Sequence, residues 1–191
     1  MIRLIVGLGN PGSQYEKTRH NAGFLFLDRL VSACSGDWSN EAKFQGLVAN
    51  CIFGAHKVIL LKPQTFMNRS GMSVGSLVRY YKINTEEILV VHDELDLGAG
   101  VCKLKKADGH AGHNGLRDII ASLSEKDFYR LRVGIGRPAS GKNVADFVLS
   151  NLSKQESASM EESFGLAEAQ ISAIVSGDMS LAMNSLNKKV A

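Results

Sequence analysis

The stretch VGLGNPGSQYEKTRHNAGF, residues 6–24, decides the fold of this chain. It begins at the end of a short, mostly apolar run over residues 2–8, which predicts a buried β-strand, and it breaks at once into a Gly-Asn-Pro-Gly turn. Asn10 and His20 are therefore expected beyond the carboxyl end of an early strand. Ligands bind at that end in open α/β sheets, so a titratable imidazole near a neutral amide predicts a candidate site.

The same turn also satisfies the G-x-G-x-x-G pattern of dinucleotide-binding folds. That pattern has to open a helix, whereas Pro11 disfavours helical geometry at Asn10 and no apolar helical stripe starts before Ala22. The acidic residue that such a fold needs after its second strand is missing too, because Asp28 falls within a helical pattern. We therefore favour a turn that presents Asn10 over a dinucleotide site.

The rest of the chain intermixes helical and strand-like segments. We expect helices over residues 22–35, 70–81, 116–123 and 153–176, a short helix or turn over 144–149, and a short amphipathic tail over 181–186. Strands are expected over residues 44–53, 57–61, 88–91, 101–106 and 129–136, the first two as a hairpin. Asn68 or Ser70 is the expected cap of the second helix. This pattern predicts one globular α/β domain over residues 1–191, with a twisted, mixed, mostly parallel β-sheet flanked by helices.

Composition limits the class and compartment of the protein. The 191 residues are 45% hydrophobic and 21% charged, which is ordinary for a globular domain. The chain has no run of about 18 apolar residues and no secretion signal pattern, so we expect a cytoplasmic protein without a membrane partner. Its three cysteines, Cys34, Cys51 and Cys102, are odd in number and far apart. They predict buried free thiols rather than a disulfide or a metal site.

Basic residues gather in one region. The net charge of the chain is only +3, yet residues 99–142 hold nine Lys and Arg against four Asp and Glu. A local basic excess suits a partner that carries phosphates; the alternative is a solvated surface of mixed charge.

A second apolar strand, residues 88–91, ends in His92-Asp93-Glu94. If this strand and the first run parallel and adjacent, Asp93 can reach His20. A carboxylate behind a histidine fixes its tautomer and stabilises the imidazolium, which makes the histidine a general base. The chain has no G-x-S-x-G motif and no cysteine in a polar turn, so a nucleophilic Ser or Cys has no support.

Three amides follow strand or loop ends near the expected site: Asn10, Asn68 and Asn114. An asparagine donates and accepts hydrogen bonds without titrating, so it suits peptide groups or an ordered water. Alternatively, each is a turn or cap residue. Phe66 and Met67 precede Asn68, and an exposed Phe-Met-Asn just ahead of a helix start would be unusual; the alternative is that Phe66 and Met67 fill the core.

Two segments are rich in metal-ligand types, residues 92–96 and residues 110–113. His-x-x-His on a glycine loop could hold zinc or iron, but neither segment has a recognised ligand spacing, and Gly109 and Gly112 leave the loop poorly preorganised. We therefore expect no metal. A metal-dependent phosphoesterase and a non-catalytic RNA-binding protein remain the alternatives.

Several separated motifs closely resemble bacterial-type peptidyl-tRNA hydrolase, in the same order over most of the chain. They are GLGNPG (residues 7–12), TRHNAG (18–23), TFMN (65–68), HDELD (92–96) and GHNGL (112–116). The resemblance implies a twisted mixed sheet, a monomer without metal or cofactor, and peptidyl-tRNA as the partner. It also implies cleavage of the ester that joins a peptide to tRNA, which recycles tRNA from chains dropped by the ribosome.

The resemblance also implies a role for individual residues. His20 would activate water, Asp93 would keep it basic and oriented, and Asn10 would distinguish a blocked amino group from a free one. The residues implied to bind the peptide end, order the water or shape the cleft are Tyr15, Phe66, Met67, Asn68, His113 and Asn114. Those implied to grip tRNA phosphate are Lys103, Lys105 and Arg132.

Two details of the phosphate grip depart from the family pattern or leave a choice. Arg130 and Arg132 both fall on the expected strand, and we assign the role to Arg132 because it directly precedes an aliphatic residue and a glycine. Ala107 and Asp108 replace glycines that are common in the family, and Asp108 adds a negative charge near the expected phosphate path.

Overall fold

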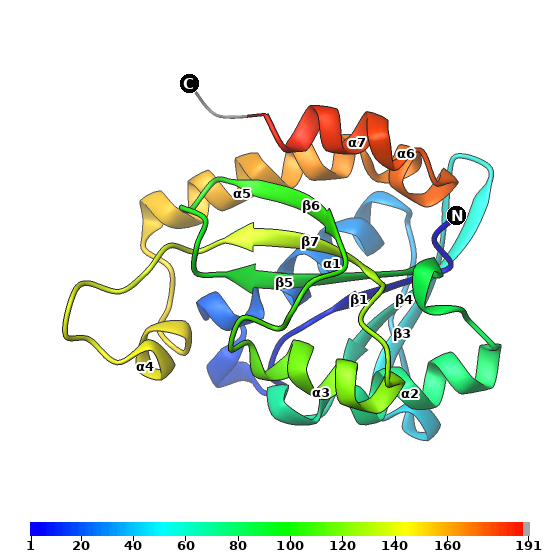
Figure 1. The fold of residues 1–191 in the computed structure, drawn as a ribbon, viewed down its shortest axis with the longest axis horizontal. Helices are drawn as coiled ribbons and strands as arrows, with labels where there is room; N and C mark the ends of the chain where they lie inside the picture. Colours follow the sequence, from blue (N-terminus) through cyan, green and yellow to red (C-terminus); the bar gives the residue numbers. More distant parts are fainter. Residues whose placement is uncertain (189–191) are drawn as a thin grey trace.

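Seven strands form one mixed sheet between two layers of helices (Figure 1). The structure, a computed structural model, describes residues 1–188. The strands are β1 (Leu4–Gly7), β2 (Ser39–Glu41), β3 (Gly46–Phe53), β4 (His56–Pro63), β5 (Ile88–Glu94), β6 (Cys102–Lys106) and β7 (Tyr129–Gly134). The helices are α1 (Ala22–Ala33), α2 (Ser70–Tyr81), α3 (Asn114–Leu123), α4 (Val144–Val148), α5 (Lys154–Ala169), α6 (Ile171–Ser176) and α7 (Met179–Leu186). Short 3-10 turns include η1 (Ser13–Tyr15), η2 (Arg19–Asn21), η3 (Ala42–Phe44), η4 (Met67–Arg69) and η5 (Thr85–Glu87).

The centre of the sheet is parallel and its edges are antiparallel. The strand order is β2-β3-β4-β1-β5-β7-β6, in which β4, β1, β5 and β7 run parallel to one another. The hairpin β3–β4 and the edge strand β6 pair antiparallel. The predicted α/β class and mixed, mostly parallel sheet are confirmed. The expected domain covers residues 1–191, of which the last three lie outside the described residues.

Strand alternation divides the apolar residues between two cores. Ile5 of β1 faces α1, α5 and the C-terminal helices, whereas Leu4 and Val6 face α2 and α3. Figure 1 shows α5, α6 and α7 along one side of the sheet and α2 and α3 on the other. Among residues 1–188, no helix combines the length and the apolar character needed to cross a membrane.

Two glycines bring the start of α1 against the ends of the central strands. A Cβ on Gly23 would lie 2.4 Å from the Leu8 nitrogen and from the Val91 oxygen, and a Cβ on Gly7 would lie 2.4 Å from the Gly23 oxygen. Only residues without a side chain permit this approach. It places η2, which precedes α1 and carries His20, beside the end of β5.

Several expectations need correction. Cys34 and Cys51 form a disulfide between the end of α1 and β3, so only Cys102 is the expected buried free thiol; sequence spacing could not show that these two residues meet. The long C-terminal helix is broken at Gln170 into α5 and α6, and Leu166, expected on its apolar face, is 62% exposed. The expected loop before the hairpin contains the short edge strand β2.

Candidate active site

A cavity of about 670 Å³ opens at the carboxyl ends of the parallel strands. Its walls come from the end of β5, the η4 turn, the loop before α3, and α4, which projects beyond the sheet in Figure 1. The predicted residues that line it are Asn10, His20, Phe66, Met67, Asn68, Asp93, Lys105, His113, Asn114 and Arg132. The position agrees with the rule that ligands bind beyond the carboxyl ends of strands in open α/β sheets.

His20 and Asp93 meet as predicted, because β1 and β5 are parallel neighbours. The Nδ1 atom of His20 lies 3.0 Å from both carboxylate oxygens of Asp93. Nδ1 therefore carries the proton and donates it to the carboxylate, so the lone pair of the neutral imidazole is on Nε2. His20 lines the cavity, and its side chain is only 12% exposed. This arrangement can accept a proton from a group in the cavity.

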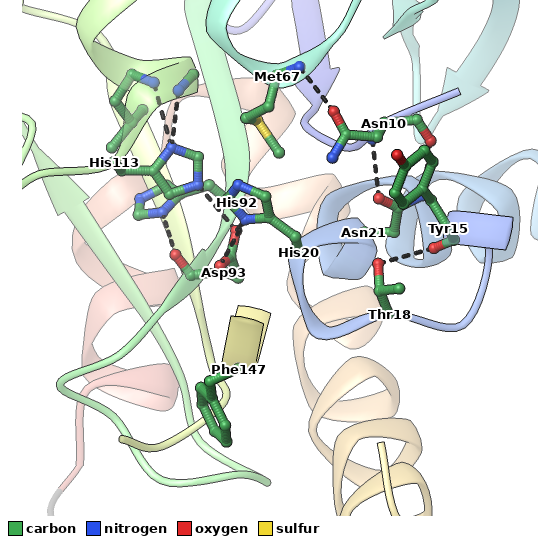
Figure 2. Close-up of polar contacts among 12 residues, drawn as sticks. Asn10, Tyr15, Thr18, His20, Asn21, Met67, His92, Asp93, His113 and Phe147 are labelled. Carbon is green, nitrogen blue, oxygen red and sulfur yellow. Dashed lines mark hydrogen bonds and ion pairs between the residues drawn. The ribbon is translucent and has the colours of Figure 1, made fainter. Parts of the chain in front are cut away.

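His113 is a second partner of Asp93. Its Nδ1 accepts hydrogen bonds from the backbone N–H groups of Gly115 and Leu116, which makes it the N-cap of α3 (Figure 2). Because Nδ1 is an acceptor there, the proton of the neutral ring is on Nε2, which donates to the Asp93 carboxylate at 2.8 Å. The sequence placed His113 in the cleft wall but did not reveal this bond.

Burial and neighbouring charges shift the pKa values of Asp93, His20 and His92. Burial alone would raise the pKa of Asp93, but the neighbouring His20 and His113 hold it well below its usual range. Burial works to lower the pKa of His20, yet the charge and hydrogen bond of Asp93 more than offset it and raise the pKa above the ordinary 6.5. Burial and the nearby His113 lower the pKa of His92 to about 3, so this ring stays neutral. A carboxylate with a basic imidazole beside it suits general-base chemistry.

Asn10 is held in place on both sides. Its backbone N–H donates to Asn21 Oδ1 at 2.8 Å and its carbonyl accepts from Asn21 Nδ2 at 3.0 Å. Its own Oδ1 accepts from the Met67 backbone N–H at 2.8 Å, as Figure 2 shows. Among the described residues nothing accepts from the Asn10 side-chain NH₂, which is left to donate to a ligand in the cavity.

Asn68 is not the cap of α2, which corrects one expectation, and neither is Ser70. The N-cap is Arg69, whose side chain makes no cap bond. Asp118 of α3 supplies the acceptor instead, taking the Gly71 backbone N–H at 2.7 Å. Asn68 is exposed at the cavity, with no hydrogen bond of its side chain to another described residue.

The other predicted wall residues differ in burial. Met67 is 4% exposed and belongs to the core facing α2 and α3, whereas Phe66 is 60% exposed, and both line the cavity. Asn114 is exposed, and its Oδ1 accepts from Arg117 at 3.2 Å. Tyr15 lies beside Asn10 in Figure 2 but is not among the residues that line the cavity.

Four cations share one face of the β6–β7 pair. Lys103 is opposite Arg132 in the register, and Lys105 is opposite Arg130. Side chains directly opposite in an antiparallel pair lie on the same face. Arg130 is 3% exposed, and both of its terminal nitrogens donate hydrogen bonds to carbonyls of the loop before α3. Arg130 therefore has no terminal nitrogen left to bind a phosphate in the cavity. Arg132 is accessible, which supports its assignment over Arg130.

The His20, Asp93 and His113 side chains offer ligand atoms within 4.8 Å of one another. A metal on His113 Nε2 would require its other nitrogen to carry a proton, but Nδ1 accepts two backbone N–H bonds. These residues therefore fit a hydrogen-bonded set better than a metal site.

Known proteins are similar to this chain in sequence and in fold. A family model described as peptidyl-tRNA hydrolase matches residues 4–191. The chain belongs to the peptidyl-tRNA hydrolase family. A relative of this name in Methylococcus capsulatus is 50% identical over 187 residues (98% of this chain, 100% of the relative), and one in Dichelobacter nodosus is 48% identical (98% and 99%). The crystal structure of peptidyl-tRNA hydrolase from Acinetobacter baumannii has a TM-score of 0.94, with 45% identity and coverage of 97% of this chain and 94% of that one.

In this member of the peptidyl-tRNA hydrolase family, Arg19 supports the site in a way that sequence reasoning missed. Its guanidinium, beside His20 in the chain, binds both oxygens of Glu156 at 3.0 and 2.8 Å. It also donates to Ser150 Oγ and to the Asn151 carbonyl, and stacks over Phe147 at 4.3 Å. An arginine directly before the predicted base was the available signal, but its partners are more than 125 residues away. The contact ties the turn that carries His20 to the segment that follows α4.

Proposed function

We propose that this protein hydrolyses the ester bond between a peptide and tRNA, with His20 as the general base and an ordered water as the nucleophile. The main support is the hydrogen bond between His20 Nδ1 and the Asp93 carboxylate, at 3.0 Å. The cavity that His20 lines also contains amide and cationic side chains. Family membership supports the substrate, because the relatives bear the name of this reaction. Recycling of tRNA from prematurely released peptidyl-tRNA is part of the proposal.

In the proposed reaction, water attacks the ester carbonyl carbon while His20 Nε2 takes a proton from it. Asp93 stabilises the imidazolium that forms, since its carboxylate accepts the Nδ1 proton. When the tetrahedral intermediate collapses, the bond between carbon and the ribose oxygen breaks, and the imidazolium returns its proton to that oxygen. The products are a free peptide acid and tRNA.

The remaining predicted residues bind or orient the substrate. The free NH₂ of Asn10 suits the carbonyl of a blocked amino group, while Asn68 and Asn114 offer amides for the peptide end or the water. Phe66, Met67 and His113 form the wall, with Tyr15 next to Asn10. Lys103, Lys105 and Arg132 suit the tRNA phosphates, whose contacts dominate nucleic-acid affinity. We also propose a monomer that acts in the cytoplasm without metal or cofactor.

The test compares N-acetyl-aminoacyl-tRNA with the same unblocked aminoacyl-tRNA, using wild-type and His20→Ala protein in chelator. We expect release from the blocked substrate only, dependent on His20 and resistant to chelator. Binding of tRNA without release would identify an RNA-binding protein, and loss of wild-type activity in chelator would identify a metal enzyme. Near-full turnover by His20→Ala would show that the base is wrongly assigned.

A further inference from the structure

Lys105, a cation proposed to grip tRNA phosphate, is already paired within the chain. Its Nζ forms an ion pair with Oδ2 of Asp108, three residues later. Both side chains are about half exposed at the cavity edge. A phosphate that reaches Lys105 therefore meets a carboxylate on the same ammonium group.

Asp108 is fixed where it can compete. Buried Arg130 donates to the Asp108 carbonyl at 2.7 Å and to the Gly109 carbonyl at 2.6 Å, which holds the backbone of the loop onto β7. The Gly109 N–H donates to Asp108 Oδ1 at 2.8 Å. One carboxylate oxygen is thus used for local structure, and the other is left for Lys105.

The other cations of this face do not have the same restraint. Glu94 accepts from Arg132 Nε at 2.9 Å, which orients the guanidinium and leaves its terminal nitrogens without a partner among residues 1–188. Lys103 has no carboxylate partner within the same part of the chain. Of the four cations on this face, Lys105 is the one whose charged nitrogen is paired with a carboxylate in the described part of the chain and has no second charged nitrogen to offer a phosphate.

We propose that Asp108 lowers the affinity of this protein for tRNA, because its carboxylate occupies Lys105 until a substrate phosphate displaces it. The inference rests on the proposed function, which supplies the phosphate partner. An exposed ion pair is weak, so a phosphate can displace the Asp108 carboxylate from Lys105 at a small cost in binding free energy. The negative charge also repels neighbouring phosphates, an effect that salt screens over about a Debye length. Asp108 thus favours release of tRNA over tight retention.

Asp108→Asn is the most informative variant, because an asparagine Oδ1 still accepts the Gly109 N–H while the negative charge that pairs with Lys105 is removed. The matched control is Asp37→Asn, an exposed carboxylate between α1 and β2, at the opposite edge of the sheet. The measurement is the Kd of deacylated tRNA over a salt series, with the KM of N-acetyl-aminoacyl-tRNA hydrolysis in parallel. We expect Asp108→Asn to bind about two- to fivefold tighter at low salt, with convergence at high salt, while Asp37→Asn matches wild type.

Lys105→Gln completes a double-mutant cycle. If Asp108 acts by occupying Lys105, the gain from Asp108→Asn shrinks in the Lys105→Gln background. An equal gain in both backgrounds, no gain, or weaker binding by Asp108→Asn would overturn the inference; weaker binding would mean that the pair preorganises Lys105. Failure of the proposed function is separate, since wild-type protein would then release no peptide from the blocked substrate.

Discussion

Replacement of Asp93 by Asn isolates the electrostatic part of the proposed mechanism. The variant keeps an oxygen acceptor for His20 Nδ1 and nearly the same volume, but it removes a charge 3.0 Å from the imidazole. In a partly buried site, two unit charges about 4 Å apart interact by roughly 4 kcal/mol, or about a thousandfold in rate. We therefore expect kcat/KM for N-acetyl-aminoacyl-tRNA to fall by about 10³.

The pH dependence of the variant gives an independent signature. Asp93 is what raises the pKa of His20 against the effect of burial, so only the lowering effect of burial remains without its charge. A base must be deprotonated to act, so wild-type activity is expected to rise with pH through a midpoint above 6.5. In Asp93→Asn this acid limb moves to lower pH, even though the maximal rate is far smaller.

Initial rates under kcat/KM conditions across the range in which histidine titrates measure both quantities. Asp96→Asn, which removes an exposed carboxylate two residues past the end of β5, is the control for a change of net charge and is expected to leave the acid limb in place. A less than tenfold loss in Asp93→Asn, or an acid limb that stays or moves upward, would refute the assignment of Asp93 as the partner of the base.

Three further variants test the supporting structure. Asn10→Asp keeps the acceptor for the Met67 N–H but loses the free NH₂, so we expect lower kcat/KM on blocked substrate with an unchanged Tm; Asn10→Ala should also lower the stability by about 1–3 kcal/mol because that buried N–H loses its partner. Equal Tm values for the two would contradict this distinction. His113→Asn retains a helix cap but loses the bond to Asp93. The Asp93 carboxylate then serves His20 alone and raises its pKa further, so the acid limb of the pH–rate profile should move to higher pH. A shift of this limb to lower pH would contradict the role of His113 as a second partner of Asp93. Gly71→Ala would place a Cβ 2.3 Å from the Asp118 carbonyl oxygen, and thermal unfolding should show a loss of at least about 2 kcal/mol; an unchanged Tm would mean that α2 and α3 separate easily.

The sequence predicted the fold class and the main contact of the site because both depend on local patterns. Apolar runs identified the central strands, and the segments that follow two of them placed His20 and Asp93 at one edge. The turn at residues 7–12 leads into the single 3-10 turn η1 and not into an α-helix, which agrees with the choice against a dinucleotide fold.

What the sequence could not predict depends on contacts between distant residues. The Cys34–Cys51 disulfide and the Arg19–Glu156 pair each join residues whose neighbourhood only the tertiary structure defines. The helix break at Gln170 has no glycine or proline next to it that would have predicted it from the sequence. Local propensity is a weak guide wherever tertiary packing decides the outcome.

The predicted amides reach the cavity because neighbouring side chains perform the local structural tasks that would otherwise use them. A polar residue at a helix start normally caps that helix, but Asp118 accepts the N–H at the start of α2 and His113 accepts those at the start of α3. Asn68 and Asn114 stand at those two helix starts and make neither cap bond. In Asn10 one side chain has both a structural and an unused group: Oδ1 accepts the Met67 backbone N–H, and the NH₂ has no acceptor among the described residues. Because other residues accept the backbone N–H groups at these helix starts, the amide donors of Asn68 and Asn114 stay available at the cavity, as the proposed function requires.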